Sequence, residues 1–153
     1  MKTLPETVLA YIEKDNSFLM LYRNKKQNDI NANKWIGVGG HVEPNESIEN
    51  ALKREIKEET GLNAIEYQYK GLIYFNYGEL SEIMHLFTVS KVNGELIECN
   101  EGTLKYIPKN EVLNIPIWEG DRIFLKKILS NDPYFELELN YQQDTLVSYR
   151  FIK

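Results

Sequence analysis

Two runs of apolar residues near the start of the chain have the length and composition of β-strands. They are TVLAYI at 7–12 and FLMLYRN at 18–24, separated by the polar sequence EKDNS. Apolar runs that flank such turn-forming residues are typical of a β-hairpin. The polar stretch 25–34 follows as a loop. WIGVGG at 35–40 is a short apolar run whose glycines permit close approach of the backbone.

The rest of the chain alternates further strand patterns with one clear helical pattern. Strand-like segments rich in β-branched and aromatic residues, or alternating in polarity, occur at 65–78, 82–92, 103–107, 134–141 and 144–151. The last two predict a closing hairpin. The i, i+3, i+4 apolar spacing of EGDRIFLKKIL predicts a helix over 119–129, and Pro108 opens a segment, PKNEVLN, for which we expect a short helix.

This order of elements sets the expected fold class. No linker, repeat or low-complexity segment interrupts the chain, so we expect residues 1–153 to form a single domain. Strands mixed with two main helices predict an α/β or α+β fold, in which one mixed sheet has helices packed against it.

The first of these helices, predicted from about Ser47 to Thr60, carries acids on the face that it should bury. At 100° per residue from Glu55, Ala51 lies near −40° and Leu52 near +60°, which marks the buried stripe. Glu58 at about −60° and Glu59 at about +40° continue this stripe. Acids at the carboxyl end of a helix also cost roughly 0.3–1 kcal/mol each.

Two interpretations of these acids are open. In the first, the helix is a solvated charged one whose Lys53, Arg54 and Lys57 pair locally with the glutamates. In the second, the carboxylates face a cleft and share divalent cations. The angular positions favour the second, and oxygen ligands without nearby His or Cys suit Mg²⁺ or Mn²⁺ better than zinc.

Composition excludes several other classes of protein. The net charge of −5 argues against a nucleic acid polymer as partner, and the amino-terminal apolar runs are too short for a signal peptide or a membrane span. A single cysteine, Cys99, cannot form an internal disulfide, which fits a reducing compartment, and we expect a cytoplasmic protein. An acidic protein that handles phosphate compounds needs cations to do so.

Residues 40–62 match the signature of the Nudix hydrolases, G-x5-E-x7-R-E-U-x-E-E-x-G-U, in which U is aliphatic. Every specified position is filled: Gly40, Glu46, Arg54, Glu55, Ile56, Glu58, Glu59, Gly61 and Leu62. The resemblance implies a Nudix fold, a mixed sheet between helices, and a loop–helix–loop that binds divalent metal. It implies that Glu55, Glu58 and Glu59 are metal ligands together with a carbonyl of Gly39 or Gly40.

The same resemblance assigns supporting roles. Arg54 would orient the carboxylates, Glu46 would support the loop, and Gly61 would end the helix in the left-handed conformation that glycine permits. Glu101 matches a loop glutamate that serves the site in MutT-type enzymes as base or metal ligand. The general base stays open between Glu55, Glu59 and Glu101, and Glu101 is equally well interpreted as a turn residue before Gly102.

Three further segments, 33–43, 99–108 and 116–121, resemble the MutT/MutX-type 8-oxo-dGTP diphosphatases within this family. The resemblance implies water attack on a phosphorus of an oxidised purine triphosphate, giving the monophosphate and pyrophosphate. Such an activity serves nucleotide pool sanitation and DNA repair. The alternative is a Nudix pyrophosphatase that acts on a nucleotide sugar, a dinucleotide or a capped RNA end. A ligand sensor without catalysis is disfavoured because the signature is intact.

Base and phosphate contacts are expected outside the signature. Trp118 would stack on a purine and Asp121 would accept hydrogen bonds from its edge, against the alternatives of a core tryptophan and a helix N-cap aspartate. Ile36 and His41 stand where relatives have asparagine and lysine, so base and phosphate contacts there differ. Arg23 matches a phosphate-contacting arginine or lies on a solvated strand edge. Either a monomer or a homodimer fits the sequence.

Overall fold

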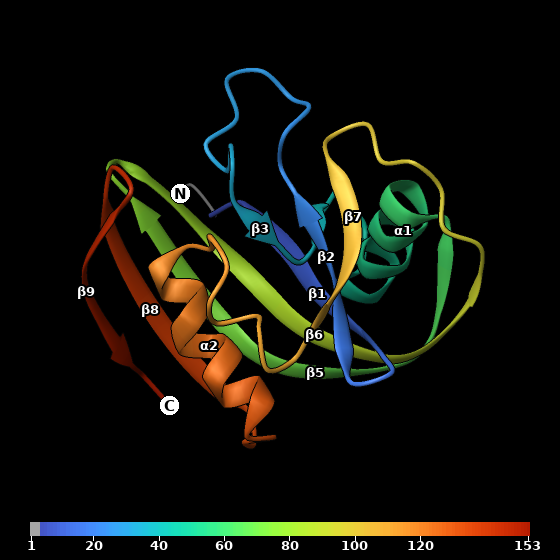
Figure 1. Ribbon diagram of the computed structural model, residues 1–153. Coiled ribbons are helices and arrows are strands. Elements are labelled where there is room, and N and C mark those ends of the chain that lie inside the picture. The colour runs from blue at the N-terminus through green and yellow to red at the C-terminus, as the bar shows by residue number, and fades with distance from the viewer. Residues whose placement is uncertain (1–3) are drawn as a thin grey trace.

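The computed structural model describes residues 4–153, and its centre is one mixed β-sheet (Figure 1). Its strands are β1 (Glu6–Lys14), β2 (Ser17–Tyr22), β3 (Trp35–Ile36), β4 (Val38–His41), β5 (Leu62–Tyr77), β6 (Leu80–Gly94), β7 (Thr103–Pro108), β8 (Phe135–Gln142) and β9 (Thr145–Phe151). The order is β3-β2-β1-β6-β5-β8-β9, while β4 pairs with β1 and β7 pairs with β2. Parallel pairs β1–β6 and β5–β8 among antiparallel ones make the sheet mixed, as predicted.

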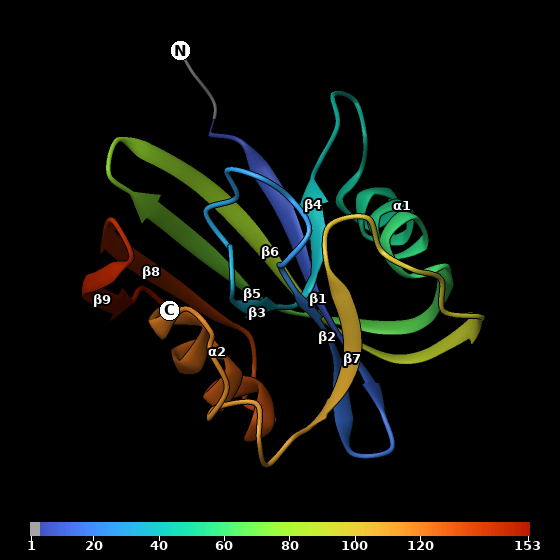
Figure 2. The same ribbon diagram turned by 45° about the horizontal axis from the view of Figure 1, so that its top comes forward.

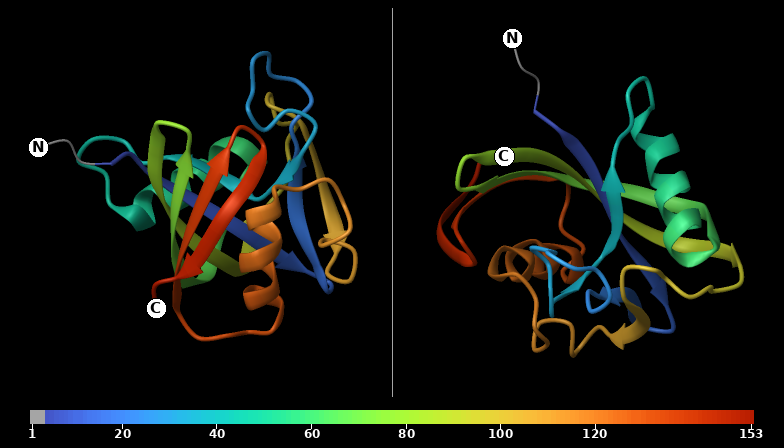
Figure 3. Two further views of the ribbon diagram at one scale, coloured as in Figure 1. Left: turned by 90° about the vertical axis from the view of Figure 1, so that its left-hand side faces the viewer. Right: turned by 90° about the horizontal axis from the view of Figure 1, so that it is seen from above.

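The two helices, α1 (Ile48–Thr60) and α2 (Glu119–Leu129), cover opposite faces of this sheet (Figure 3, right). Alternation along β1 explains the arrangement, because successive side chains of a strand point to opposite faces. Val8 and Ala10 belong to the buried cluster that includes Leu52 of α1, whereas Tyr11 belongs to the cluster that includes Phe124 of α2. The fold class expected from the sequence is confirmed.

Local sequence accounts for the ends of α1. The Ser47 hydroxyl accepts a hydrogen bond from the Asn50 backbone N–H at 3.1 Å, which satisfies one of the free donors at the helix start. Gly61 has φ +80°, so the helix ends in the left-handed conformation, as expected.

Both predicted hairpins are present, and the first has a sharp turn. Asp15 and Asn16 both have positive φ (49° and 60°), the combination that a two-residue hairpin of matching twist requires. The closing hairpin joins β8 to β9, with Leu137 opposite Phe151 and Leu139 opposite Tyr149.

The apolar run WIGVGG forms two short strands: β3 pairs with β2, β4 pairs with β1, and Gly37 lies between them. The short helix expected at 108–114 is wrong, because this segment forms consecutive turns. Its backbone bonds run from Glu111 N to Pro108 O and from Asn114 N to Glu111 O. The segment then delivers Pro116, whose carbonyl accepts a hydrogen bond from Trp35 N, so sheet contacts override the local helical pattern.

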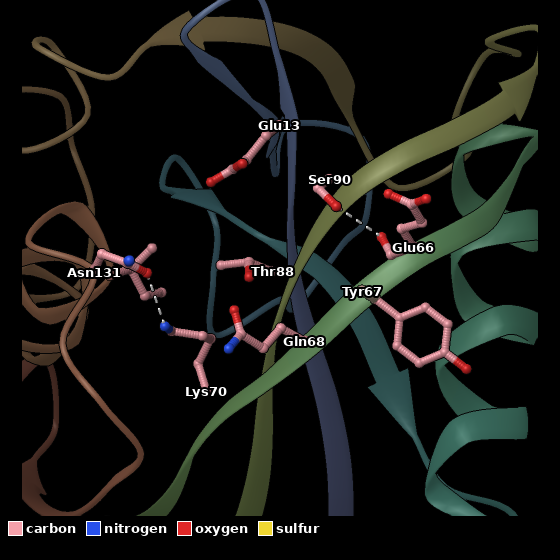
Figure 4. A pocket seen from close by; sticks show the side chains of 9 residues that line it. Glu13, Glu66, Tyr67, Gln68, Lys70, Thr88, Ser90 and Asn131 are labelled. Atoms are coloured by element: carbon pink, nitrogen blue, oxygen red, sulfur yellow. Dashed lines mark hydrogen bonds between the residues drawn. The ribbon is translucent and has the colours of Figure 1, made fainter.

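A polar groove of about 380 Å³ lies between β5, β6 and the end of α2 (Figure 4). Its one buried cation, Lys70, donates from Nζ to Asn131 Oδ1 at 3.3 Å and to the Asp132 carbonyl at 3.1 Å. A cation at the carboxyl end of a helix complements the free carbonyls there. Lys70 therefore has a structural role at the end of α2. Neither α1 nor α2, in the part of the chain described, is long and apolar enough to cross a membrane.

Candidate active site

One cleft of about 700 Å³ collects nearly all of the residues that the sequence singles out. Figure 2 shows the elements around it: the β2–β3 loop, β4, the β6–β7 loop, and the helices α1 and α2. The predicted site residues that line it are Arg23, Ile36, Gly40, His41, Arg54, Glu55, Glu58, Glu101, Trp118 and Asp121. Glu46 and Glu59 do not line the cleft, and Glu59 is buried.

The three glutamates of α1 differ in their contact with solvent. The side chain of Glu58 is 59% exposed and that of Glu55 14% exposed, while Glu59 is 7% exposed as a whole residue. The acids therefore run from the rim of the cleft to the buried stripe beside Leu52 and Ile56. The alternative of a solvated charged helix agrees with the exposed Glu58 and with the local pairing of Arg54 to Glu55 and Glu58, but it does not agree with the burial of Glu59.

Arg54 connects most of these carboxylates. Its Nε and one terminal nitrogen donate to both oxygens of Glu46, at 2.8 and 2.9 Å, and its other terminal nitrogen donates to Glu55 at 2.8 Å and to Glu58 at 3.2 Å. The guanidinium also donates to the His41 carbonyl at 2.9 Å. Arg54 lowers the pKa of Glu46 to about 2. The planar guanidinium fork thus holds three carboxylates and the end of one strand together.

Gly40 explains how a strand can approach these acids so closely. A Cβ at this position would lie 2.6 Å from the carboxyl atoms of Glu55. Any other residue would therefore displace that carboxylate. Glycine at position 40 places the backbone of β4 directly against the acidic end of the cleft.

Among the three glutamates of α1, Glu59 has the least favourable surroundings for a charged carboxylate. Its Oε2 is buried and has no hydrogen-bond partner among residues 4–153. Burial, followed by Glu55 and Glu101, raises the pKa of Glu59 to about 9, and Arg23 opposes them. A buried carboxylate without a partner is expensive unless a proton or a cation neutralises it.

The donor set of this end of the cleft fits a divalent cation. It offers carboxylate oxygens from α1 and Glu101, an orphaned buried oxygen on Glu59, and a glycine that leaves room beside Glu55. Hard oxygen donors of this kind are what Mg²⁺ and Mn²⁺ prefer. The residues present therefore fit the metal that the signature implies.

Glu101 and Arg23 come to this end from two neighbouring loops. Arg23 is buried, donates to Asp29 at 2.7 Å, and lies 3.5 Å from Glu101, which also lies 3.6 Å from Lys26. One carboxylate oxygen of Glu101 is within 4.8 Å of one of Glu59. The interpretation of Arg23 as a solvated edge residue is wrong, and Glu101 is more than a turn residue because its carboxylate enters the cleft.

The other end of the cleft is aromatic. Trp118 is 4% exposed and meets Phe75, Tyr77 and Tyr141 in edge-to-face geometry. The Lys34 ammonium lies 4.7 Å from its ring centroid. In this conformation a cation covers a face of the indole, so a base that stacks on that face has to displace Lys34.

Asp121 lies in the first turn of α2, where it is buried close to Trp118. Burial raises its pKa to about 8, while Arg122 and Lys34 act in the opposite direction. The N-cap of α2 is Trp118 and no side chain caps it, so the interpretation of Asp121 as an N-cap is wrong. Its carboxyl lines the cleft instead.

Sequence reasoning missed Asn31, which lines this end from the β2–β3 loop. Its Oδ1 accepts a hydrogen bond from Trp118 Nε1 at 2.7 Å. Because an indole nitrogen only donates, the Asn31 oxygen must face Trp118, and its NH₂ group remains as a donor. The polar loop 25–34 has no periodicity that could have identified this residue.

Ile36 and His41, the two departures noted in the sequence, lie at different depths. Ile36 of β3 packs against the core cluster of α2 and contributes only apolar surface to the cleft. The His41 side chain is exposed, with Nε2 3.9 Å from a carboxylate oxygen of Glu82. Only the His41 carbonyl contacts the acidic network, through Arg54.

Comparisons with known proteins agree with this geometry. The chain is 29% identical over 126 residues to the oxidized purine nucleoside triphosphate hydrolase of Mus musculus, with 81% of each chain covered. It is 31% identical to the CTP pyrophosphohydrolase of Escherichia coli strain K12, with 82% of this chain and 91% of that protein covered. The crystal structure of the mutator MutT protein from Bacillus halodurans superimposes with a TM-score of 0.86 at 28% identity, covering 97% and 98% of the two chains.

The family itself follows from a direct match. Residues 3–128 match the family model of the NUDIX domain, which is most of the chain and includes both the acidic helix and the start of α2. With the signature, the fold and the cleft in agreement, this chain belongs to the Nudix family.

Proposed function

We propose that this protein is a metal-dependent nucleoside triphosphate diphosphatase that hydrolyses an oxidised purine nucleotide of the 8-oxo-dGTP type. The observation that carries the proposal is that one cleft joins two chemically different ends. One end holds the carboxylates of α1 and Glu101, and the other holds Trp118, Asp121 and Asn31. A volume of about 700 Å³ is within the range of pockets that enclose a small-molecule ligand.

At the acidic end, Glu55, Glu58, Glu59 and Glu101, with the Gly40 carbonyl, are the groups that would hold Mg²⁺ or Mn²⁺. Bound divalent cations supply charge for the phosphate oxygens and acidify water. Arg54 keeps Glu55 and Glu58 in place through its fork. Arg23 and Lys26 bring positive charge to the same end.

The reaction is the attack of water on a phosphorus of the triphosphate. A bond from that phosphorus to the bridging oxygen breaks, and the nucleoside monophosphate and pyrophosphate leave. Glu55 and Glu101 line the cleft, whereas Glu59 is buried behind them, so the first two are better placed to take the proton of the water. Glu59 would then serve as a metal ligand from the buried side of the cleft.

At the aromatic end, two polar groups would recognise the base. The NH₂ group of Asn31 is a donor of fixed orientation, and the Asp121 carboxyl accepts or donates according to its protonation. A guanine-type edge presents a carbonyl oxygen beside N–H donors. The carbonyl oxygen would accept a hydrogen bond from the Asn31 NH₂ group, and the N–H donors would pair with the Asp121 carboxyl. The resemblance to the mouse oxidized purine hydrolase supports this choice of base.

A second substrate class is favoured by a specific observation. The similarity to the E. coli CTP pyrophosphohydrolase covers as much of the chain as the similarity to the mouse protein. A cytosine nucleotide would undergo the same chemistry with a smaller base next to Trp118. Nucleotide sugars, dinucleotides and capped RNA ends keep the same chemistry, but nothing at the aromatic end favours them.

A nucleotide screen in Mg²⁺ tests the proposal. The substrates are 8-oxo-dGTP, dGTP, CTP, a nucleotide sugar, a dinucleotide and a capped RNA, with released pyrophosphate and orthophosphate measured separately. We expect pyrophosphate as the product and kcat/KM for 8-oxo-dGTP well above that for dGTP and CTP. Comparable values for dGTP and 8-oxo-dGTP would refute a sanitising role, and preference for CTP would select the second class. Without metal, turnover should disappear in every case.

A further inference from the structure

The only cysteine of the chain lies next to the acidic cluster of the cleft. Cys99 is in the β6–β7 loop and is 5% exposed. It forms an isolated backbone bridge with Gly102, so residues 99–102 make a tight turn that holds Cys99 and Glu101 at one place. Lys25 fixes the same turn from the neighbouring loop, because its Nζ donates to the Cys99 carbonyl at 3.2 Å.

Three side chains converge there: Cys99, Glu59 and Glu101. The Cys99 sulfur and one carboxylate oxygen from each glutamate all lie within 4.8 Å of one another. Three such atoms have a common centre within about 2.8 Å of each, whereas zinc bonds are about 2.0–2.3 Å long. Small side-chain rotations would therefore bring all three atoms onto one ion.

A second feature also points to a cation at this cluster. Glu59 is more than nine-tenths buried, and its Oε2 has no hydrogen-bond partner among the residues described. Glu101 lines the cleft, so the cluster is open to ions that enter from there.

The thiol changes which ion fits. Mg²⁺ requires near-octahedral oxygen ligands and gains nothing from sulfur. Zn²⁺ and the softer Cd²⁺ bind thiolate sulfur together with carboxylate oxygen, and three protein ligands with one open position are a common zinc arrangement. The thiol proton is released to solvent as the sulfur–metal bond forms.

We propose that Cys99, Glu59 and Glu101 form a site for a thiophilic divalent cation, Zn²⁺ in particular, that is distinct in its ligand set from the Mg²⁺ site. An ion held there engages Glu59 and Glu101, so it withdraws both carboxylates from the catalytic cations and stops the reaction. The binding of the ion does not depend on the proposed function. The inhibition step rests on the proposed function.

Binding is tested with Cd²⁺, whose bond to a thiolate gives an ultraviolet charge-transfer absorption, alongside calorimetry on the full chain. Wild type should show the band, saturating at one Cd²⁺ per chain, and Mg²⁺ should not produce it. Cys99→Ser and Cys99→Ala should lack the band and bind Cd²⁺ at least about tenfold more weakly. No band in wild type, or equal Cd²⁺ affinity in Cys99→Ser, would overturn the proposal. Cys99→Ser nearly conserves volume, and thermal melts of both variants check folding.

Inhibition is tested with the best nucleotide substrate in excess Mg²⁺. Cys99→Ala should keep the basal turnover, and the Zn²⁺ concentration for half-inhibition should rise at least about tenfold relative to wild type. Equal inhibition of the two proteins would overturn the inhibition step. If no nucleotide is turned over, the proposed function fails while the absorption experiment still decides whether the site exists.

Discussion

Each helix of this protein buries one acid at the end that faces the cleft, and the two acids have opposite surroundings. Glu59 is in the last turn of α1, next to Glu55 and Glu101. Asp121 is in the first turn of α2, with Arg122 and Lys34 near enough to lower its pKa. Burial nevertheless raises the pKa of both, to about 9 and about 8.

The difference lies in what can relieve each acid. A helix carboxyl end carries partial negative charge and an amino end partial positive charge, so α1 disfavours its buried acid and α2 favours its own. Glu59 has two further carboxylates beside it, and a multivalent cation relieves all three at once. No other carboxylate contributes to the raised pKa of Asp121, so a single proton or a hydrogen bond from a base is sufficient to relieve it. Under the proposed function, a buried carboxyl group would therefore serve metal binding at one end of the cleft and base recognition at the other.

The largest expected effect is that of Glu59→Gln. Turnover in Mg²⁺ should fall by more than about 100-fold, beyond the roughly 10–100-fold usual for losing a group that only supports a metal ligand. Without metal, the variant should unfold at the same or higher temperature than wild type, because it removes an unpartnered buried carboxylate. Steady-state kinetics and thermal melts measure the two effects.

The control for this variant is Glu119→Gln, which removes an exposed acid from the start of α2. Wild type and the control should gain melting temperature when Mg²⁺ is added, since ligand that binds only the folded state stabilises it. Glu59→Gln should gain little. An equal Mg²⁺ shift in all three proteins would contradict the role of Glu59 as a ligand.

A smaller effect is expected from Arg54→Lys. Lysine keeps the charge but cannot donate at once to Glu46, Glu55 and Glu58. We expect a loss of about 10–100-fold in kcat/KM, carried mainly by weaker Mg²⁺ dependence. The matched control is Lys53→Gln, an exposed cation one residue earlier on the same helix. If the two variants behave alike, the fork has no positioning role.

The two ends of the cleft also differ in how far they could be predicted from the sequence. Most of the acidic end is local: Gly40 to Gly61 lie within one loop–helix segment, so spacing along the chain indicates which of their side chains meet. Glu101 and Arg23 reach this end from two other loops, and they were indicated only by resemblance. The aromatic end is assembled from loop 25–34, β3, β5 and the start of α2. Trp118 and Asp121 were expected from resemblance, but the contact from Trp118 to Asn31 spans 87 positions and has no local signal.

The wrong expectation of a helix at 108–114 has the same origin. Residues 108–114 contain helix-compatible residues, yet they form turns because Pro116 has to reach the backbone of Trp35. Likewise, WIGVGG divides at Gly37 because its two halves pair with different strands. In both cases non-local backbone hydrogen bonds decide a conformation that local propensity leaves open.

At the aromatic end, Asp121→Asn should change how stability depends on pH. The folded pKa of Asp121 is raised above its unfolded value, so the unfolded state releases this proton at lower pH than the folded state does. Wild-type stability therefore falls as pH rises from about 4 towards about 8, by roughly 1.4 kcal/mol per pH unit from this group. Asn cannot titrate and removes that slope.

Urea unfolding at pH 5 and pH 7.5 measures the effect. The difference in free energy of unfolding between Asp121→Asn and wild type should change between these two pH values. Glu59 contributes a slope of the same sign to both proteins and cancels. A difference that stays constant over this range would show that Asp121 is ionised in the folded protein. The surroundings of Asp121 would then resemble an ion-pair site rather than a neutral pocket.

The smallest effect is expected at Lys34, which decides whether the face of Trp118 is available to a base. Lys34→Met removes a cation–π contact worth about 0.5–1 kcal/mol, so stability should fall by that amount while KM for a purine triphosphate decreases about two- to fivefold and kcat stays unchanged. Lys109→Met is the matched control, because Lys109 lies 5.1 Å from the ring centroid of Phe18, outside the cleft. It should lose similar stability without any change in KM. A raised KM in Lys34→Met would mean that the ammonium contacts the substrate itself, and both ends of the cleft would then use cations for recognition.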